Sequence, residues 1–358
     1  MSTDKMHAVW LTGHGDVSVL EYREDVPVPQ PGPGEVRVRV RAAAVNNTDI
    51  NLRIGWYSKR SAAAGEGGDS GTLSALEDGG WGGTPVVFPL IQGADACGEI
   101  EAVGRDVPAE RIGERVLIDP VLRATDGSGM AGARYLGSDC HGTFAEFVCV
   151  PAQNALRIHS TMSDEELATF PCSYLTAENL LTRAQVSDGE TILVTGASGG
   201  VGSAAVQLAR RRGARVIAVA SVEKSAALMA LGAAEVLARG EDLMRRLGAE
   251  SLDAVIDVVG GPSFTALLGI LKRGGRYAVA GAIGGALVTL DLRTVYLKDL
   301  TLHGCTVAQP GVFARLVGYI ERGEIRAALA KTYPLRELAA AQQAFLEKAH
   351  VGKIAIRV

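Results

Sequence analysis

The stretch TGASGGVGSAAVQLA, residues 195–209, decides the fold of this chain. Its glycines Gly196, Gly199 and Gly202 fall three residues apart. The apolar run ETILVTG before them is typical of a buried strand, and VGSAAVQLARRRG predicts a helix that ends at Gly213. A glycine-rich turn between a strand and a helix is typical of a dinucleotide-binding unit, where the helix N-terminus faces a pyrophosphate.

Each glycine of this turn has a predicted task. Gly199 lets the backbone approach the pyrophosphate, and Gly202 lets the helix pack closely on the strand. Ala197 stands where the usual pattern has its first glycine. The residues that we expect to contact the cofactor here are Ser198, Gly199, Gly200 and Val201. A tight turn without any ligand is the alternative, and the repeated strand–helix units around it argue against that alternative.

These units occupy the chain from residue 163 onward. Apolar runs of strand length recur as TILVT, RVIAVA, AVIDVV and RYAVAG, and helical patterns at 201–212, 223–231 and 262–272 separate them. Strands that alternate with helices predict a parallel sheet with right-handed crossovers. Ser163 with Glu166 three residues later predicts a capping box at the start of a helix.

The first part of the chain has a different texture. Runs at 6–12, 36–45 and 143–150 lie between Gly/Pro turns and predict short strands. The stretches 61–84 and 124–139 are rich in glycine and predict long loops.

Composition narrows the class of protein. A length of 358 residues predicts two domains or one large α/β domain, and 47% apolar residues are enough for a core. The net charge of −4 gives no general attraction to nucleic acid or anionic membranes. We expect neither a secretory signal nor a membrane span. Five scattered cysteines indicate reduced thiols in the cytoplasm, without a disulfide framework.

The end of the second predicted strand selects the cofactor. An NAD site usually has a carboxylate there for the ribose 2′-OH, whereas this chain has Ser221, followed by Lys224. Ser221 can donate to a 2′-phosphate and Lys224 can neutralise it, so we predict NADPH. Glu223 is the residue that opposes this prediction.

Several stretches together resemble the medium-chain dehydrogenase/reductase superfamily, within it the zinc-free quinone oxidoreductase-like branch, over nearly the whole chain. They are 31–55, QGADACGEIEAVG (92–104), RIGERV (111–116), 142–158, LTAENLL (175–181), TGASGGVG (195–202) and GKIAIRV (352–358). The resemblance implies an α/β protein with a GroES-like β-barrel catalytic domain, residues 1–159 and 311–358. It also implies a Rossmann domain with a doubly wound parallel sheet, residues 160–310, and a substrate cleft between the two domains.

The resemblance also bears on metals. Zinc-dependent relatives place a Cys and a His where this chain has Asn46 and Ala94, and only Cys172 falls where their third ligand does. The four closely spaced cysteines of a structural zinc are missing as well. We therefore expect no zinc.

Without a Lewis acid, hydride transfer to a quinone or to a conjugated C=C is easier than alcohol oxidation. The predicted catalytic residues are Asn46, Thr48 and Tyr57. Asn46 and Thr48 would donate hydrogen bonds from the cleft floor, and Tyr57 would donate a proton or stack on a planar substrate. A hydrophobic plug made by Trp56 and Tyr57 is the alternative for that tyrosine. We expect structural roles for Asp49 and Asp95.

Further cofactor contacts follow from the resemblance. Thr176 would lie at the nicotinamide ribose, and the loops with Val259 and with Gly281 and Ala282 would meet the nicotinamide end. Lys353 would reach the cofactor phosphates.

The predicted function is NADPH-dependent reduction of a quinone, enone or enoyl acceptor. The alternatives are a carbonyl/alcohol dehydrogenase that uses Thr48 and a non-catalytic NADPH-binding protein. Residues 286–305 contain an apolar edge strand that predicts a homodimer. The insert 61–84 carries Trp81 and is predicted to act as a lid over the substrate. A surface insertion without a role is the alternative.

Overall fold

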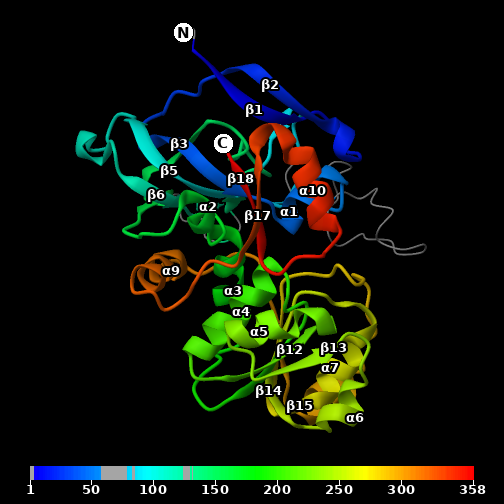
Figure 1. Cartoon of the computed structure of the whole chain (residues 1–358). Coiled ribbons are helices and arrows are strands. Elements are labelled where there is room, and N and C mark those ends of the chain that lie inside the picture. The colour runs from blue at the N-terminus through cyan, green and yellow to red at the C-terminus, as the bar shows by residue number, and fades with distance from the viewer. Residues whose placement is uncertain (1–3, 58–78, 83–84, 124–129, 131) are drawn as a thin grey trace.

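The computed structural model describes residues 4–57, 79–82, 85–123, 130 and 132–358, and Figure 1 shows them as two lobes. The upper lobe in this view holds β1 to β6 together with β17 and β18, and both chain termini lie there. The lower lobe holds a second sheet with helices against it. The helix α3 lies between the two lobes.

The upper lobe is built around β3 (Glu35–Ala44), which pairs with three other strands. Its sequence EVRVRVRAAA alternates, so the valines are buried and the arginines face outward. The other strands of its seven-stranded sheet are β5 (Asp95–Val103), β6 (Arg115–Ile118), β9 (Phe147–Pro151), β10 (Ala155–Arg157), β17 (Leu329–Pro334) and β18 (Lys353–Arg357). Two small sheets complete the lobe: β2 (Leu20–Pro27), β1 (Lys5–Leu11) and β4 (Leu90–Ile91) form one, and β7 (Val121–Leu122) and β8 (Arg134–Tyr135) form the other.

The lower lobe is a six-stranded parallel sheet in the order β13-β12-β11-β14-β15-β16. Its strands are β11 (Thr191–Val194), β12 (Arg215–Ala220), β13 (Glu235–Ala238), β14 (Leu252–Asp257), β15 (Leu271–Val279) and β16 (Thr301–Gly304). Its helices are α4 (Gly200–Arg211), α5 (Ser225–Leu231), α6 (Leu243–Leu247), α7 (Phe264–Ile270) and α8 (Leu292–Leu297). From β11, the strands β12 and β13 follow on one side of the sheet and β14, β15 and β16 follow on the other. The strand order therefore reverses between β11 and β14, and ligands of such sheets bind at the carboxyl ends of the strands beside that point. The predicted doubly wound α/β fold is confirmed.

The remaining helices are α1 (Asn47–Arg53), α2 (Asp164–Leu167), α3 (Pro171–Arg183), α9 (Val312–Glu321) and α10 (Leu338–Leu346). The capping box predicted at Ser163 and Glu166 is present at the start of α2. After residue 311, β17 and β18 join the sheet of the upper lobe, whereas α9 packs against α3. The exact domain boundaries stay a prediction.

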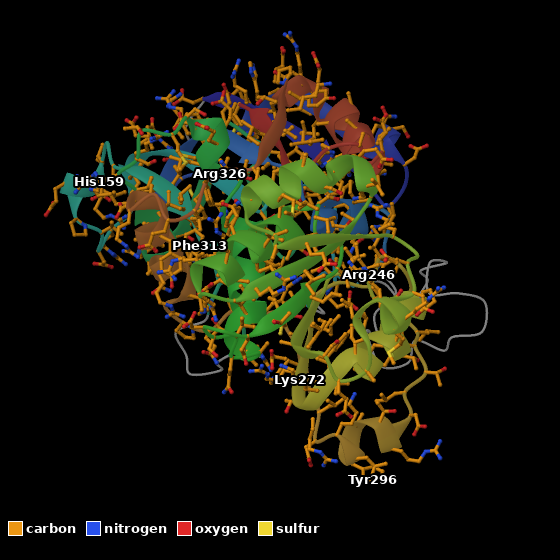
Figure 2. All side chains as sticks on the ribbon, turned by 60° about the horizontal axis from the view of Figure 1, so that its bottom comes forward. His159, Arg246, Lys272, Tyr296, Phe313 and Arg326 are labelled. Atoms are coloured by element: carbon orange, nitrogen blue, oxygen red, sulfur yellow. The ribbon has the colours of Figure 1, made fainter. Side chains whose placement is uncertain are left out.

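Three sequence predictions need correction or completion. The strand expected at 143–150 begins at Phe147, because Ala145 makes only an isolated bridge with Ala8. The segment 286–305 is a strand only at Thr301–Gly304, since α8 precedes it, and Figure 2 shows Tyr296 of α8 at the outer end of its lobe. Most of the predicted lid, 61–84, lies outside the described residues.

Two compositional expectations can also be compared with the structure. All five cysteines are free thiols. In the part of the chain that the structure describes, no helix is both long enough and apolar enough to cross a membrane.

Candidate active site

The glycine turn lies between β11 and α4, at the carboxyl end of the sheet. Gly196 has the positive φ of 55°, whereas Ala197 is fully buried. The left-handed residue of the turn is therefore Gly196, which explains why the chain tolerates Ala197 in the usual glycine position. A Cβ on Gly202 would lie 2.3 Å from the Gly196 carbonyl oxygen, so only glycine permits this approach of helix and strand. Gly199 is the N-cap of α4, and no side chain caps the helix there, which leaves its first turn suited to an anion.

Asp257 connects this turn with the next loop of the sheet. Its carboxylate accepts hydrogen bonds from Thr195 Oγ1 at 2.5 Å, Val259 N at 2.8 Å and Gly260 N at 3.1 Å. Tyr277 Oη donates to its other oxygen at 2.5 Å. Asp257 begins the loop predicted at the nicotinamide end but was not itself assigned a role, although a carboxylate at the end of the apolar run AVIDVV was a visible signal.

The loop after β15 is tied to the loop after β14. Gly284 N donates to the Val259 carbonyl at 2.7 Å, and a Cβ on Gly281 would lie 2.8 Å from the Val258 carbonyl oxygen. The structure thus brings Val259, Gly281 and Ala282 to the same sheet edge as Ser198 and its neighbours.

Cations gather where β12 ends. Lys224 is buried, and its Nζ donates to the Lys348 carbonyl at 2.5 Å and to Ser198 Oγ at 3.4 Å. Burial and the nearby Arg239 lower the pKa of Lys224, while burial and Lys224 lower the pKa of Lys348 to about 8. Burial and the neighbouring lysines lower the pKa of His350 to about 4, so this imidazole is neutral at pH 7. Such mutual repulsion indicates a place suited to an anion.

Lys348 and His350 belong to the connection between α10 and β18. Neither residue was among the predicted cofactor contacts. This connection also bonds to the glycine turn, because Gly352 N donates to the Ser198 carbonyl at 2.9 Å. Ser221, at the start of this region, is half-buried, and the neighbouring Glu223 is exposed. Hydrogen bonds from its own backbone N–H and from Ser221 lower the pKa of Glu223, so this carboxyl group is ionised.

On the upper lobe, α1 brings two predicted hydroxyl groups together. Thr48 Oγ1 lies 3.3 Å from Tyr57 Oη, and Asn51 Nδ2 donates to the same phenol oxygen at 3.4 Å. Asn47 Nδ2 donates to Asn51 Oδ1 at 3.0 Å, which turns the NH₂ group of Asn51 toward Tyr57. The phenol oxygen therefore accepts from Asn51, and its proton is available to Thr48 or to a bound molecule. Burial raises the pKa of Tyr57, so the phenol is protonated at neutral pH.

Asn46 and Lys353 both bond to Asp95 inside the protein. Asn46 is buried and donates from Nδ2 to Asp95 Oδ2 at 2.8 Å, so its donor is used inside the protein rather than offered to a substrate. Lys353 Nζ donates to Asn46 Oδ1 and to Asp95 Oδ2, the latter at 2.8 Å, and is buried. The carboxylate attracts this ammonium away from the predicted phosphate position.

Asp49 completes this buried cluster, which we call the Asp95 cluster: Asn46, Asp49, Asp95 and Lys353. Asp49 Oδ2 accepts from Asn46 N at 2.8 Å and thereby caps α1. Burial raises the pKa of Asp49 to about 7, with a further contribution from the charge of Asp95. The structural roles predicted for both aspartates agree with these bonds.

Cys172 adjoins the Asp95 cluster at the start of α3. Its N–H donates to Asp95 Oδ1 at 2.6 Å, and Tyr135 Oη donates to its sulfur at 3.0 Å. Burial, followed by the charge of Asp95, raises the pKa of Cys172 to about 12, so the sulfur is a neutral thiol. Thr176, one turn further along α3, is half-buried and donates to the Cys172 carbonyl at 2.8 Å. Trp81 stacks on Tyr135 with ring centroids 4.6 Å apart.

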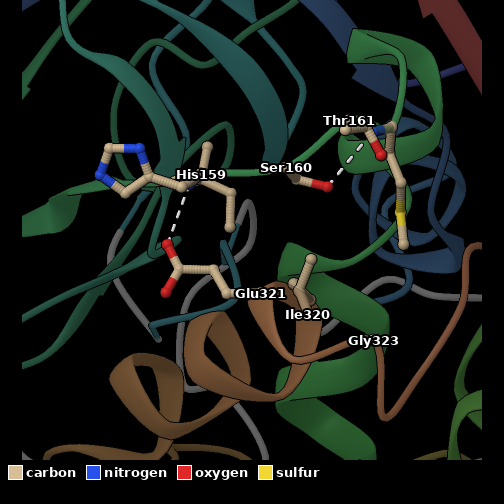
Figure 3. A pocket seen from close by; sticks show the side chains of 8 residues that line it. His159, Ser160, Thr161, Ile320, Glu321 and Gly323 are labelled. Atoms are coloured by element: carbon tan, nitrogen blue, oxygen red, sulfur yellow. Dashed lines mark hydrogen bonds between the residues drawn. The ribbon is translucent and has the colours of Figure 1, made fainter.

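Two further features bear on where ligands bind. Among residues 4–57, 79–82, 85–123, 130 and 132–358, no group of three or more His, Cys, Asp or Glu side chains is arranged to hold a metal ion. A surface pocket lies between the segment His159–Met162 and the C-terminal end of α9, where His159 N donates to Glu321 at 2.9 Å (Figure 3). None of the predicted site residues lines that pocket.

Known proteins resemble both lobes. Residues 32–160 match the family described as alcohol dehydrogenase GroES-like domain, and residues 200–322 match the family described as zinc-binding dehydrogenase. Acryloyl-coenzyme A reductase of Metallosphaera sedula is 32% identical over 279 residues, which cover 75% of this chain and 83% of that protein. Human quinone oxidoreductase is 26% identical over 94% of this chain and 93% of its own length. A solved structure from Sinorhizobium meliloti 1021, named provisionally as an alcohol dehydrogenase, is 45% identical, with a TM-score of 0.88 over 100% of this chain and 97% of that one.

Proposed function

Because the chain belongs to the medium-chain dehydrogenase/reductase superfamily of nicotinamide-dependent oxidoreductases, we propose that it reduces a quinone or an α,β-unsaturated carbonyl compound with NADPH and without zinc. The observation that carries this proposal is the hydroxyl pair of Thr48 and Tyr57, 3.3 Å apart, on a lobe that faces a glycine turn made for a dinucleotide. The pair offers a proton donor to an oxygen on which negative charge develops.

The residues of the lower lobe fit a nicotinamide dinucleotide. A Cβ on Gly199 would meet no atom closer than 3.5 Å, so this backbone has an open side for a pyrophosphate. The first turn of α4 would hold that pyrophosphate, with Ser198, Gly200 and Val201 beside it. Thr176 and the loops with Val259, Gly281 and Ala282 would hold the nicotinamide end. When bound, the cofactor supplies a hydride to the acceptor.

The cations at the end of β12 support NADPH over NADH. Lys224, Arg239 and Lys348 form no salt bridge with a carboxylate within the described residues, and their charges repel one another. A 2′-phosphate would relieve this repulsion. Ser221 stands where an NAD-specific site usually has a carboxylate, while the exposed Glu223 is the feature that favours NADH.

On the acceptor side, Tyr57 would protonate or hydrogen-bond the carbonyl oxygen as hydride arrives at the conjugated carbon. Its raised pKa keeps the proton on the phenol at neutral pH. Asn51 directs the phenol oxygen and Thr48 offers a second hydroxyl, so the developing charge meets prearranged donors. The relatives named for acryloyl-coenzyme A and quinone reduction support a conjugated acceptor.

The proposal of a zinc-free mechanism rests on the residues at the ligand positions of zinc-dependent relatives. Asn46 and Ala94 stand at two of them, and the sulfur of Cys172 is a neutral thiol that accepts from Tyr135. The ammonium of Lys353 lies against Asn46, so a cation already occupies this part of the site.

Two other functions remain candidates on specific observations. Thr48, together with the similarity to the alcohol dehydrogenase structure, favours a carbonyl/alcohol dehydrogenase. A non-catalytic NADPH-binding protein would need only the glycine turn and the cations.

The test is NADPH oxidation with 2-cyclohexen-1-one, 1,4-benzoquinone and acryloyl-coenzyme A, with simple aldehydes as a comparison. The proposal predicts turnover of conjugated acceptors above simple aldehydes. A preference for aldehydes supports the first alternative, and NADPH binding without any turnover supports the second.

We also propose that the protein is a cytoplasmic homodimer that pairs through residues 286–305. The edge strand β16 and the segment before it expose large apolar side chains: Leu287, Val288, Leu290, Leu292, Tyr296, Leu297 and Leu302. A patch of this kind beside an open sheet edge favours pairing of two copies around a two-fold axis. Light scattering at micromolar concentration should give twice the chain mass, and L287E with Y296E should give the mass of one chain. A monomeric unmodified protein would contradict this proposal.

A further inference from the structure

The Asp95 cluster lies where three parts of the active site meet. Lys353 is the first residue of β18, Asp95 the first of β5, and Asn46 the N-cap of α1. Both members of the Lys353–Asp95 ion pair are buried, with side-chain exposures of 2% and 0%. The pair therefore works without competition from water.

The bonds of this cluster extend into both lobes. Asp95 accepts from the Cys172 N–H at the start of α3, the helix that carries Thr176. Asn46 and Asp49 form the capping box of α1, the helix that carries Thr48 and leads to Tyr57. The ammonium of Lys353 joins these two groups through Asp95 Oδ2 and Asn46 Oδ1.

The stem of Lys353 reaches the cofactor side. A Cβ on Gly200 would lie 2.7 Å from Lys353 Cδ and 2.5 Å from Ser173 Oγ, so the lysine stem lies against the first turn of α4. The backbone before it is fixed as well, because Gly352 N donates to Ser198 O and Lys353 N donates to Ala328 O at 2.8 Å. One side chain thus contacts the glycine turn with its methylenes and the acceptor side with its charge.

A buried ion pair is weak evidence for stability, because desolvation offsets most of its Coulomb energy. A role in holding parts in register explains such a pair better. We propose that Lys353, through Asp95 and Asn46, is a positioning residue that sets α1 against α3 and α4, and thereby sets the distance over which hydride is transferred. It is not a ligand of the cofactor phosphates. The effect on hydride transfer rests on the proposed function, whereas the link that Lys353 makes between α1, α3 and α4 does not.

The experiment compares K353M, D95N and the double variant K353M/D95N with the unmodified protein. K272M is the matched control, because Lys272 forms an ion pair of similar length, 2.7 Å, with Asp253 in the other lobe. NADPH affinity is measured by fluorescence titration, and the single-turnover rate with 2-cyclohexen-1-one is measured with NADPH and with 4-deuterated NADPH. Thermal unfolding reports stability.

We expect K353M to bind NADPH within about twofold of the unmodified protein and to transfer hydride about 10- to 100-fold more slowly, as misplacement near 1 Å does. The deuterium isotope effect on the steady-state kcat, measured alongside, should rise, since hydride transfer becomes slower than product release. The double variant should regain thermal stability relative to K353M, because no buried charge is left unpaired, yet its hydride transfer should stay slow. K272M should match the unmodified protein in NADPH affinity and in the rate of hydride transfer.

Three results would overturn the inference. NADPH affinity that falls tenfold or more in K353M but not in D95N would identify Lys353 as a phosphate ligand. Recovery of the hydride-transfer rate in the double variant would identify the pair as structural only. If the unmodified protein reduces no acceptor, the proposed function fails, and amide hydrogen exchange then tests the link: exchange in α1 and in the first turn of α3 that is unchanged in K353M would contradict it.

Discussion

The two sides of the active site use their polar groups in opposite ways. On the cofactor side, the first turn of α4 has no side-chain cap, the ammonium of Lys224 donates to neutral oxygens, and its charge acts on Lys348. On the acceptor side, Asn46, Asp49, Asp95 and Lys353 bond to each other inside the protein. We infer from this difference that the cofactor side is suited to an anionic ligand, whereas the charges of the acceptor side are paired within the protein and its hydroxyl groups remain for a ligand.

The largest expected effect is the loss of the acceptor-side proton donor. Y57F should lower kcat with 2-cyclohexen-1-one by about 10²- to 10⁴-fold, the usual contribution of a general acid, while NADPH affinity stays unchanged. N51L should cause a smaller loss, because the phenol keeps its proton and loses only the N–H that directs it. Steady-state kinetics measure both.

The control for this prediction is Y333F, because the Tyr333 hydroxyl bonds to Lys331 on the surface of the upper lobe. It should retain full activity. If Y57F is as active as Y333F, the phenol is part of a hydrophobic plug and the acceptor side has no acid at this position.

Two glycines of the turn have different expected roles: Gly202 in the packing of α4 on the strand, and Gly199 in binding the pyrophosphate. A methyl group at Gly202 would lie 2.3 Å from the Gly196 oxygen, so G202A should destabilise the fold by about 1–3 kcal/mol, as overpacking does. Gly199 has a φ of −76° and space for a methyl group, so G199A should change stability by less than about 0.5 kcal/mol. G199A should nevertheless weaken NADPH binding, because the methyl group stands where the pyrophosphate approaches.

Denaturant unfolding and NADPH titration of both variants measure this contrast. Unchanged NADPH affinity in G199A would mean that the turn does not hold the pyrophosphate. An unaffected stability in G202A would mean that α4 can move away from the strand.

The cofactor preference comes next in size. K224M keeps the buried stem and removes the charge, so the preference for NADPH over NADH should fall by about 1–3 kcal/mol, the range for a charge-assisted contact. Fluorescence titration of both cofactors measures it, with K331M as the control for charge removal. Equal affinity of the unmodified protein for NADPH and NADH would refute the assignment, and Glu223 would then be the residue to replace.

A pH dependence of stability is expected from Asp49. Burial raises its folded pKa to about 7, above the unfolded value near 4, so the folded protein binds more protons in this window. Stability from this group is therefore greatest below about pH 4 and is lost as the pH rises to about 7, by at most about 1.4 kcal/mol per pH unit. D49N should be less stable, since an amide caps α1 less well, but should lose this slope. A slope that persists in D49N would assign it to another group.

The parts that the sequence predicts well are those that the local chain determines. The order of strands and helices after residue 163 follows from hydrophobic periodicity, and the glycine turn follows from backbone sterics within eight residues. Even the displaced turn glycine, Gly196 in place of Ala197, lies within the quoted motif. The capping box of Ser163 and Glu166 is local for the same reason.

The bonds of Asn46 and Lys353 to Asp95 could not be predicted, because these partners are remote in sequence. Asp95 lies 49 residues from Asn46 and 258 residues from Lys353, and no periodicity shows that a barrel will bring them together. Lys348 and His350 were missed for the same reason, since they reach the end of β12 from the last connection of the chain. Thr48 and Tyr57 could be predicted together because they are close in sequence: Thr48 lies on α1 and Tyr57 lies in the turn that follows it.

The proposed zinc-free reduction of a conjugated acceptor by NADPH is tested most directly by locating the transferred hydride in the product and by comparing NADPH with NADH as its source. Purified protein, treated with a chelator, is mixed with 4-deuterated NADPH or NADH and with 2-cyclohexen-1-one, and the product is analysed by NMR. We expect cyclohexanone with deuterium on the β-carbon, formed faster with NADPH and at a rate that chelation does not change. Deuterium on the hydroxyl-bearing carbon of an allylic alcohol product, a faster reaction with NADH, or activity that is lost on chelation and returns with zinc would contradict it.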